Sequence, residues 1–441
     1  KNTAIGGLAG DAITSGDSNT FVGYLSGSGT STTDENTAVG HMAYAKGTGI
    51  GNTCLGFAAG SSGLNAGTAL SGDNNTLLGH AAGYDLTDGD GNVLIGRAAG
   101  DHMTTGNNNI AIGLEAANAL VGAADQNIAI GRNALGGCTA ATSSNIAIGD
   151  GTLKHASYAA ANTNLAIGQD AGDAITSGTE NVLIGHQAGS ALVDDSQNTA
   201  LGFNALTGST AGDGNTAIGS HCMDAAITGS NNTCVGREAM GAAAGAMADN
   251  VGVGGYALAQ LTDAASVKNV AVGRNAGQSG PGAANVTKAI QCVYIGADTD
   301  AGHATTSVNE VVIGYNANGG GSNTIVLGNT SIGSIEGQVD FAAFSDRRIK
   351  RDITNDNTGL AFVEKLQPVT YKFVNPADYP EAFEESRFSE KTHEQLVSPA
   401  VEAADEVWED AIVQDAREAV AEETREEVHP AVEEVREMRV L

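Results

Sequence analysis

The chain has 441 residues, of which 61 are glycine and 6 are proline; 4% are aromatic, and the formal net charge at pH 7 is -30. Collagen needs abundant proline and glycine at every third position, and a disordered chain lacks regularly spaced Ile, Val and Leu, so both classes are excluded. The acidity argues against a nucleic-acid partner, because phosphate binding depends on clustered Lys and Arg. What remains is a protein of stacked repeats, in which small residues recur at fixed places.

A five-residue motif, N-x-A-I-G with variants, recurs along the first three quarters of the chain. Its spacing is usually 17 to 19 residues, and longer units with extra small residues occur around 59–73 and 278–289. Insertions of that kind are loops, which makes them candidates for contact with a partner. The copies begin at Asn2, Asn19, Asn36, Asn52, Asn75, Asn92, Asn109, Asn127, Asn145, Asn164, Asn181, Asn198, Asn215, Asn232, Asn250 and Asn269, and degenerate copies lie at Cys292, at Glu310 and before Gly328.

Each motif predicts a short β-strand. A weaker segment, such as residues 9–16 or 171–178, follows the motif and ends in residue types that form turns. One unit is therefore interpreted as strand, turn, strand and turn, which is one coil of a parallel β-solenoid over residues 1–335. The recurring Asn is expected to form a hydrogen-bonded ladder between coils, and the recurring Gly provides a corner that can take positive φ.

Neighbouring strand positions face opposite sides, so the Ala and the Ile of one motif cannot share an interior. We expect the large residue to point to one interior and the preceding small residue toward a second crowded surface. Burying one large residue per coil stabilises by only about 1.5 to 3 kcal/mol, whereas ordering the backbone costs about 1 to 2 kcal/mol per residue. Three narrow rolls about a common axis would supply the missing burial, which predicts a homotrimer. The large residues include Ile5, Val22, Val39, Leu55, Leu78 and Ile95.

The N-x-A-I-G units resemble the head repeats of trimeric autotransporter adhesins over residues 1–335. The resemblance implies an all-β shaft in the form of a left-handed parallel β-roll trimer. The units of this chain are longer than adhesin coils typically are, so the two rolls are expected to differ in cross-section.

The cysteines are far apart in the sequence, without a CxxC pair or a His/Cys cluster at metal-ligand spacing. We therefore expect reduced thiols, no metal and no cofactor. Cys54 and Cys234 occupy the motif position that elsewhere holds Ala, which is typical of small buried side chains. The five residues are Cys54, Cys138, Cys222, Cys234 and Cys292.

Two other patterns bear on ligands and membranes. Asp85, Asp88 and Asp90 form an acidic stretch, but the spacing of calcium ligands in an EF-hand is incomplete, so an acidic turn is favoured over a calcium site. No run of about 20 apolar residues occurs, so no membrane insertion is expected.

The repeat stops near Gly337, and after a linker at 336–344 a charged block, SDRRIKRDI, begins at Ser345. Together with GLAFVEKLQPV at 359–369 and YKF at 371–373, this block resembles the endosialidase-type intramolecular chaperone. The resemblance implies a small α+β module at 345–396, which trimerises, assists folding of the upstream β-structure and then releases itself.

Cleavage in that family occurs just before the serine of the motif, which implies that the bond between Phe344 and Ser345 is cut. Ser345 would be the nucleophile and Lys350 the general base of a single-turnover autoproteolytic serine peptidase, and Asp346 could orient either partner. The like charges of neighbouring arginines would favour the neutral amine that a Ser-Lys pair needs. The alternative is a capped start of a charged helix, in which Asp346 is a turn or cap carboxylate.

Residues 397–441 are strongly acidic, with apolar residues at helical spacings up to an interruption before Pro430. This pattern predicts C-terminal amphipathic helices that contribute a trimer contact. A role at a membrane surface is disfavoured, because the polar face is negative.

Together these predictions indicate the structural shaft of a phage tail fibre, made in the host cytoplasm and located in the virion, which attaches to a host cell-surface glycan or protein. Lys1 begins inside a repeat, so a preceding N-terminal part is expected to join a tail or baseplate protein. One alternative is a trimeric adhesin on a bacterial surface, which would need a stalk and a barrel anchor. Another is a β-solenoid glycan depolymerase, which would need paired carboxylates and aromatic sugar platforms.

Overall fold

The computed structural model describes the shaft of the chain. The described residues are 1–335 without 62–68, 139–141, 156–162, 209–211, 226–227, 244, 279–286 and 303–305. The chain divides into two compact units, Lys1–Ile332 and Gly333–Leu441, and nearly all described residues belong to the first. The linker, the chaperone module and the acidic tail predicted at 336–441 lie outside the described residues.

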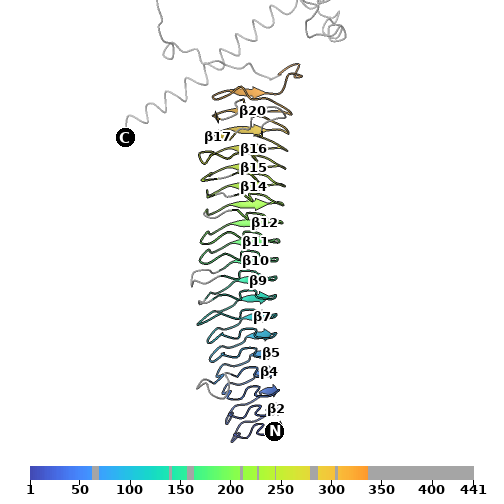
Figure 1. Cartoon of the computed structure of the whole chain (residues 1–441), viewed down its shortest axis with the longest axis vertical. Helices are drawn as coiled ribbons and strands as arrows, with labels where there is room; N and C mark the ends of the chain where they lie inside the picture. The colour runs from blue at the N-terminus through green and yellow to red at the C-terminus, as the bar shows by residue number, and fades with distance from the viewer. Residues whose placement is uncertain are drawn as a thin grey trace, which may run out of the picture. The chain divides into compact units, whose positions relative to one another are not determined.

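The first unit is a stack of coils, and the coils contribute three-residue strands that lie one above the other along the shaft (Figure 1). The strands are β1 (Thr3–Ile5), β2 (Thr20–Val22), β3 (Thr37–Val39), β4 (Thr53–Leu55), β5 (Thr76–Leu78), β6 (Val93–Ile95), β7 (Ile110–Ile112), β8 (Ile128–Ile130), β9 (Ile146–Ile148), β10 (Leu165–Ile167), β11 (Val182–Ile184), β12 (Thr199–Leu201), β13 (Thr216–Ile218), β14 (Thr233–Val235), β15 (Val251–Val253), β16 (Val270–Val272), β17 (Lys288–Ile290), β18 (Val293–Ile295), β19 (Thr306–Val308), β20 (Val311–Ile313) and β21 (Ile325–Leu327).

Nineteen of these strands form one parallel sheet, in which each strand pairs with the equivalent strand of the next coil. Equivalent positions lie opposite each other: Ala129 of β8 pairs with Ala111 of β7 and with Ala147 of β9. β17 and β19 form a separate two-stranded parallel sheet. The predicted parallel β-solenoid is therefore confirmed, and the described residues contain no helix.

The second segment of most coils is a turn and not the second strand that the sequence predicts. Residues in this segment enter the left-handed region, as Ala98 does with φ 55° and Gly100 with φ 60°. An extended strand cannot contain such residues. The segment still bonds to the next coil, because the backbone N–H of Gly100 donates to the carbonyl of Ala116 at 2.9 Å.

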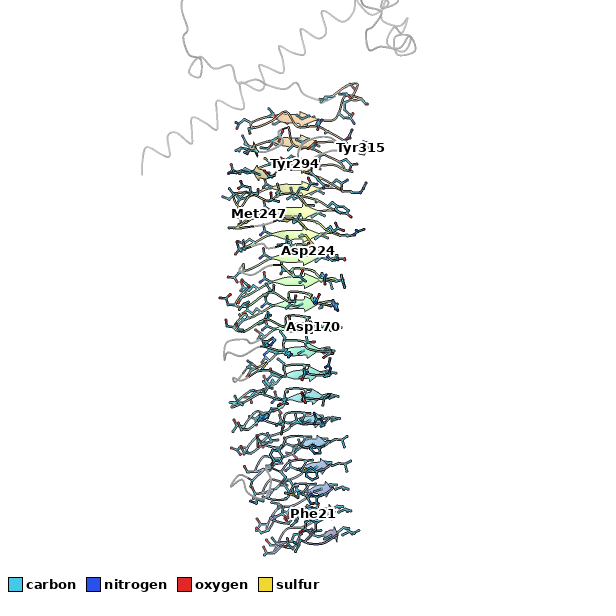
Figure 2. The ribbon with its side chains drawn as sticks, viewed as in Figure 1. Phe21, Asp170, Asp224, Met247, Tyr294 and Tyr315 are labelled. Carbon is cyan, nitrogen blue, oxygen red and sulfur yellow. A yellow bond between two sulfur atoms is a disulfide. The ribbon has the colours of Figure 1, made fainter. Side chains whose placement is uncertain are left out.

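The interior of the roll is filled by the middle residue of each strand and by apolar residues of the turn. Leu94 and Ala111 are buried middle residues, and Met103 is a buried turn residue. Figure 2 marks Phe21 and Tyr294, two of the largest side chains buried in this way. The structure confirms that the two motif positions face opposite sides. Which position faces the interior is the reverse of the expectation: the middle residue lies in the roll's own interior, and the large third residue points outward.

The recurring asparagines form the predicted ladder inside one corner of the roll. Asn109 donates from Nδ2 to Oδ1 of Asn92 at 3.0 Å and to the carbonyl of Ala124 at 2.7 Å. Its Oδ1 accepts the backbone N–H of Asn127 at 2.9 Å. Equivalent bonds recur as far as Asn269, so each buried amide connects its own coil to both neighbouring coils.

The motif glycine occupies a corner that admits no side chain. Gly113 has φ +140°, and a Cβ on it would lie 2.5 Å from the carbonyl oxygen of Gly131 in the next coil. The same conformation and close approach recur at this corner along the shaft. Glycine is therefore required by both the backbone conformation and the coil spacing.

Candidate functional site

The residues predicted to carry out self-cleavage, Phe344, Ser345, Asp346 and Lys350, all lie outside the described residues. Their roles rest on the sequence. The surface of the shaft, by contrast, is described over almost its whole length and carries two features that the fold itself does not require.

The first feature is a row of large apolar side chains along the outside of the sheet, formed by the third residue of each strand. We call this row the apolar stripe. All its members are at least partly exposed, and Leu55 and Leu201 are 45% and 44% exposed. The members are Ile5, Val22, Val39, Leu55, Leu78, Ile95, Ile112, Ile130, Ile148, Ile167, Ile184, Leu201, Ile218, Val235, Val253, Val272, Ile295, Ile313 and Leu327.

The size of the apolar stripe marks it as an interaction surface. At the usual distance between paired strands it is about 85 Å long, and with a width of about 7 Å it covers roughly 600 Å². Monomeric proteins rarely expose contiguous apolar patches of more than a few hundred Å². The stripe is therefore a candidate for burial against another chain.

The longer units do not interrupt the apolar stripe. The predicted loops at 59–73 and 278–289 are described except for residues 62–68 and 279–286. Leu55 pairs in register with Leu78, and Val272 pairs in register with Ile295, although each pair spans one of these units. The register of the sheet is therefore kept across both units.

The second feature is the pair of positions on either side of the stripe. We call the first residue of each strand the leading flank, and the residue directly after the motif glycine the trailing flank. Four trailing-flank rings, Tyr24, His41, Phe57 and His80, stack from coil to coil with centroids 5.5, 5.2 and 5.0 Å apart. Rings stacked along the shaft cover each other's faces, whereas a sugar platform needs an open face.

Other trailing-flank residues are charged and paired. Arg97 donates from Nη2 to Oε1 of Glu115 at 3.0 Å, and Arg132 forms an ion pair with Asp150 of the next coil. The hydrogen bond to Asp150 raises the pKa of Arg132 above its ordinary value. These pairs are exposed, so they contribute little to the stability of the single chain. Their main effect is to neutralise charge next to the stripe.

The acidic stretch lies on the turn side of the roll. Oδ1 of Asp88 accepts a hydrogen bond from the Ser71 hydroxyl at 3.2 Å, and Oδ1 of Asp90 accepts the backbone N–H of Asp73 at 2.7 Å. The backbone N–H of Asp85 bonds to the next coil. The described residues contain no group of three or more His, Cys, Asp or Glu that could hold a metal ion.

Several groups on the turn side, from the buried Asp195 to the exposed His102, have shifted pKa values. Burial raises the pKa of the carboxyl groups of Asp101, Asp173 and Asp195 above the ordinary range. The pKa of His102 is also raised, first by the hydrogen bond of Nδ1 to the Asn118 side chain at 2.9 Å. The protonated forms of all four groups are thus favoured by folding.

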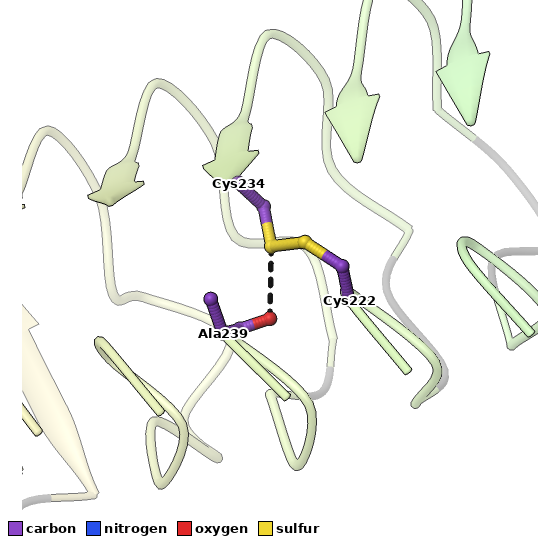
Figure 3. Close-up of a disulfide and its surroundings, with 3 residues drawn as sticks. All are labelled: Cys222, Cys234 and Ala239. Carbon is purple, nitrogen blue, oxygen red and sulfur yellow. Dashed lines mark hydrogen bonds between the residues drawn. A yellow bond between two sulfur atoms is a disulfide. The ribbon is translucent and has the colours of Figure 1, made fainter. Parts of the chain in front are cut away.

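The prediction that all cysteines are thiols is wrong for two of them. Cys222, in the turn after β13, and Cys234, in the middle of β14, form a disulfide inside the roll (Figure 3). Their Cα atoms are 6.4 Å apart, within the range that a disulfide allows. Sγ of Cys234 also lies 2.9 Å from the Ala239 carbonyl oxygen. A disulfide sulfur carries no hydrogen, so a hydrogen bond to this carbonyl would require the reduced thiol.

The sequence did not indicate this disulfide, because the two positions approach only when successive coils stack. The other three cysteines are buried and form no disulfide. Burial raises the pKa of the Cys54 thiol far above its ordinary value, which disfavours the reactive thiolate.

A buried carboxylate replaces the asparagine near the C-terminal end of the ladder. Oε1 of Glu310 accepts the backbone N–H groups of Gly302 at 3.0 Å and Gly321 at 2.8 Å, and Oε2 accepts the Tyr294 hydroxyl at 3.4 Å. Burial raises the pKa of Tyr294, so its hydroxyl remains a donor. From the sequence alone, Glu310 was identified only as the start of a degenerate copy of the motif.

Beyond the shaft, the chain matches a known family. The family model described as chaperone of endosialidase matches residues 345–410. This match supports a C-terminal chaperone module. The matched range starts at Ser345, so the module follows the β-solenoid shaft after a short linker. No curated protein and no solved structure matches the chain. Within the described part of the chain, no helix is long and apolar enough to cross a membrane.

Proposed function

We propose that three copies of this chain form the shaft of a phage tail fibre that attaches to a host cell surface. In this proposal the chaperone module assists trimer assembly and then cleaves itself off before Ser345. The observation that carries the proposal is the unbroken apolar stripe on a shaft that is followed directly by an endosialidase chaperone module.

The apolar stripe supports association of parallel copies. Three rolls that turn their stripes toward a common axis would remove about 600 Å² per chain from water, which corresponds to at most about 15 kcal/mol per chain before the costs of association. Closed rotational symmetry is the usual solution for identical chains. The homotrimer also accords with the resemblance of the repeat to trimeric adhesin heads.

Host contact is proposed for the longer units around 59–73 and 278–289. Register across both units is kept, so extra residues can be added there without disturbing the stripe. Surface insertions of this kind carry binding functions in many proteins. The ligand would be a glycan or a protein of the host surface, and the fibre would also join a tail or baseplate protein.

Self-cleavage is tested with the full chain, Ser345→Ala and the control Ser389→Ala, which lies in the same module. Intact mass under denaturing conditions should show fragments of residues 1–344 and 345–441 for the parent and the control, and an uncut chain for Ser345→Ala. An uncut parent, or a cut Ser345→Ala variant, would show that the assigned chemistry is wrong.

Trimerisation through the stripe is tested with two variants of matched exposure. Leu201 lies on the stripe, whereas Val193, which is 40% exposed, lies on the turn side of the same region. Native mass should give a trimer for the parent and for Val193→Lys. Leu201→Lys should weaken the trimer, because it buries three lysines near one another. Equal trimer stability in both variants would exclude the stripe as the interface.

A further inference from the structure

The residue types on the two flanks of the apolar stripe change along the shaft, and the change on one flank is related to the change on the other. The leading flank is Thr in eight strands of the sheet and Val, Ile or Leu in the other eleven. The Thr strands form two blocks, β1 to β5 and β12 to β14. The apolar stripe between the flanks does not vary in this way, because every coil supplies Ile, Val or Leu.

Rings on the trailing flank occur mainly where the leading flank is Thr. Five of seven aromatic or His residues at this position are in Thr coils, and the exceptions are His186 and Tyr315. Phe57 and Phe203 are 48% and 49% exposed, so they stand out from the shaft. The five residues in Thr coils are Tyr24, His41, Phe57, His80 and Phe203.

Charged residues on the trailing flank show the reverse pattern. Four of five lie in coils whose leading flank is Val, Ile or Leu, and Arg237 is the exception. The four are Arg97, Arg132, Asp150 and Arg274. Nine of the nineteen coils thus combine a bulky ring with a small Thr, or a charged side chain with a larger apolar residue.

We propose that in the trimer the trailing flank of each copy packs against the leading flank of the next copy at the same level, and that these flanks fix the axial register. The inference rests on the proposed trimer. A contact between two different surfaces of identical chains is heterologous and closes into a ring after three copies. Each ring would fill the space beside a Thr, and the stem of each Arg would lie along a Val or Ile while its charged group stays in water.

The stripe cannot fix the register, because a shift by one coil, about 4.8 Å, brings apolar residues against apolar residues again. The flanks can. A shift by one coil would move the ring of Phe203 from Thr199 to Val182, and a shift in the other direction would move His80 from Thr76 to Val93. Overpacking of this kind is destabilising.

The proposal is tested by disulfide cross-linking of the full chain with Ser220→Cys on the trailing flank of the β13 coil. A second substitution is placed on the leading flank at the same level (Thr216→Cys), one coil before (Thr199→Cys) or one coil after (Thr233→Cys). All three are Thr→Cys changes at equivalent strand positions, so they form a matched set. The parent and the Ser220→Cys single variant measure background from the native cysteines.

The variants are first shown to be trimers by native mass and are then oxidised under mild conditions and separated without reductant. The proposal expects covalent trimers at several-fold higher yield from Ser220→Cys with Thr216→Cys than from either shifted pair. Equal yields, a higher yield from a shifted pair, or trimers that no pair cross-links would overturn the flank contact while leaving the trimer intact. Monomers in every sample, the parent included, would overturn the trimer and this inference with it.

Discussion

Removing one amide from the asparagine ladder should open the shaft locally. Asn109→Ala deletes the donor to Asn92 and to the Ala124 carbonyl, and the acceptor of the Asn127 backbone N–H. Asn109, Ala124 and Asn127 are all buried, so water cannot easily replace the lost partner. The variant therefore leaves one buried carbonyl and one buried N–H without a bond.

The expected cost follows from these two groups. Leaving a buried donor or acceptor unsatisfied costs about 1 to 3 kcal/mol, so the two groups together predict a loss of about 2 to 6 kcal/mol per chain. Coils contact mainly their neighbours, so the loss should appear as opening of the adjacent coils and not of the whole shaft. In exchange rates the loss corresponds to an increase of roughly 30-fold to 20,000-fold.

Hydrogen exchange read out by mass spectrometry measures this effect in peptides that cover the coils of Asn92, Asn109 and Asn127. Gln169→Ala is the control, because its exposed amide bonds only to the neighbouring Asp170 side chain. Asn109→Asp should be at least as damaging as Ala, because it places a buried carboxylate against two acceptors, Oδ1 of Asn92 and the Ala124 carbonyl oxygen. Exchange in Asn109→Ala that matches the Gln169→Ala control would refute the role of the ladder.

Three further outcomes test other parts of the shaft. Gly113→Ala should prevent regular stacking at that coil, seen as a new protease-sensitive site, because the added Cβ would meet the Gly131 carbonyl. Lowering the pH from 7 toward 4 should raise the thermal midpoint. The pKa of Asp195 is raised in the folded chain, so the folded chain binds more protons than the unfolded chain in this window. Asp195→Asn should therefore flatten the pH dependence of the midpoint. Alkylation of the denatured chain should label three cysteines without reductant and all five with it; removing the Cys222–Cys234 bond should lower stability by about 2 to 3 kcal/mol.

The repeat period was sufficient to predict the solenoid, because stacking brings equivalent positions of successive units together. The pairing of Ala111, Ala129 and Ala147 follows directly from their spacing in the sequence. The Asn ladder could be predicted for the same reason. The prediction of a second strand in each coil was wrong. The left-handed backbone conformation of residues such as Ala98 cannot be recognised from the residue type. In this shaft alanine occupies strands and turns alike, as Ala111 in β7 and Ala98 in a turn show.

Features that depend on contacts between different positions of neighbouring coils were not predicted from the sequence. The Cys222–Cys234 disulfide joins a turn to a strand, and the stack of Tyr24, His41 and Phe57 becomes visible only when the trailing flank is aligned. The motif around Ser345 was identified by its resemblance to a family, and the family model supports the module. The roles of individual residues in cleavage stay predictions, because they lie outside the described residues.

In this regular shaft, the residues that stabilise the single chain differ from those that can direct the assembly of several chains. Nothing in the ladder distinguishes Asn109 from Asn127, and the same three strand positions pair in every coil. Within one chain this ambiguity does no harm, because the short connection between successive strands leaves each strand only its neighbouring coil to pair with. Between copies no such connection exists, and identical coils would allow slipped trimers of similar stability. Correct assembly of the proposed trimer therefore needs a feature that differs from coil to coil or occurs once per chain. The chain offers two such features, the varying flanks along the shaft and the chaperone module that follows it in the sequence.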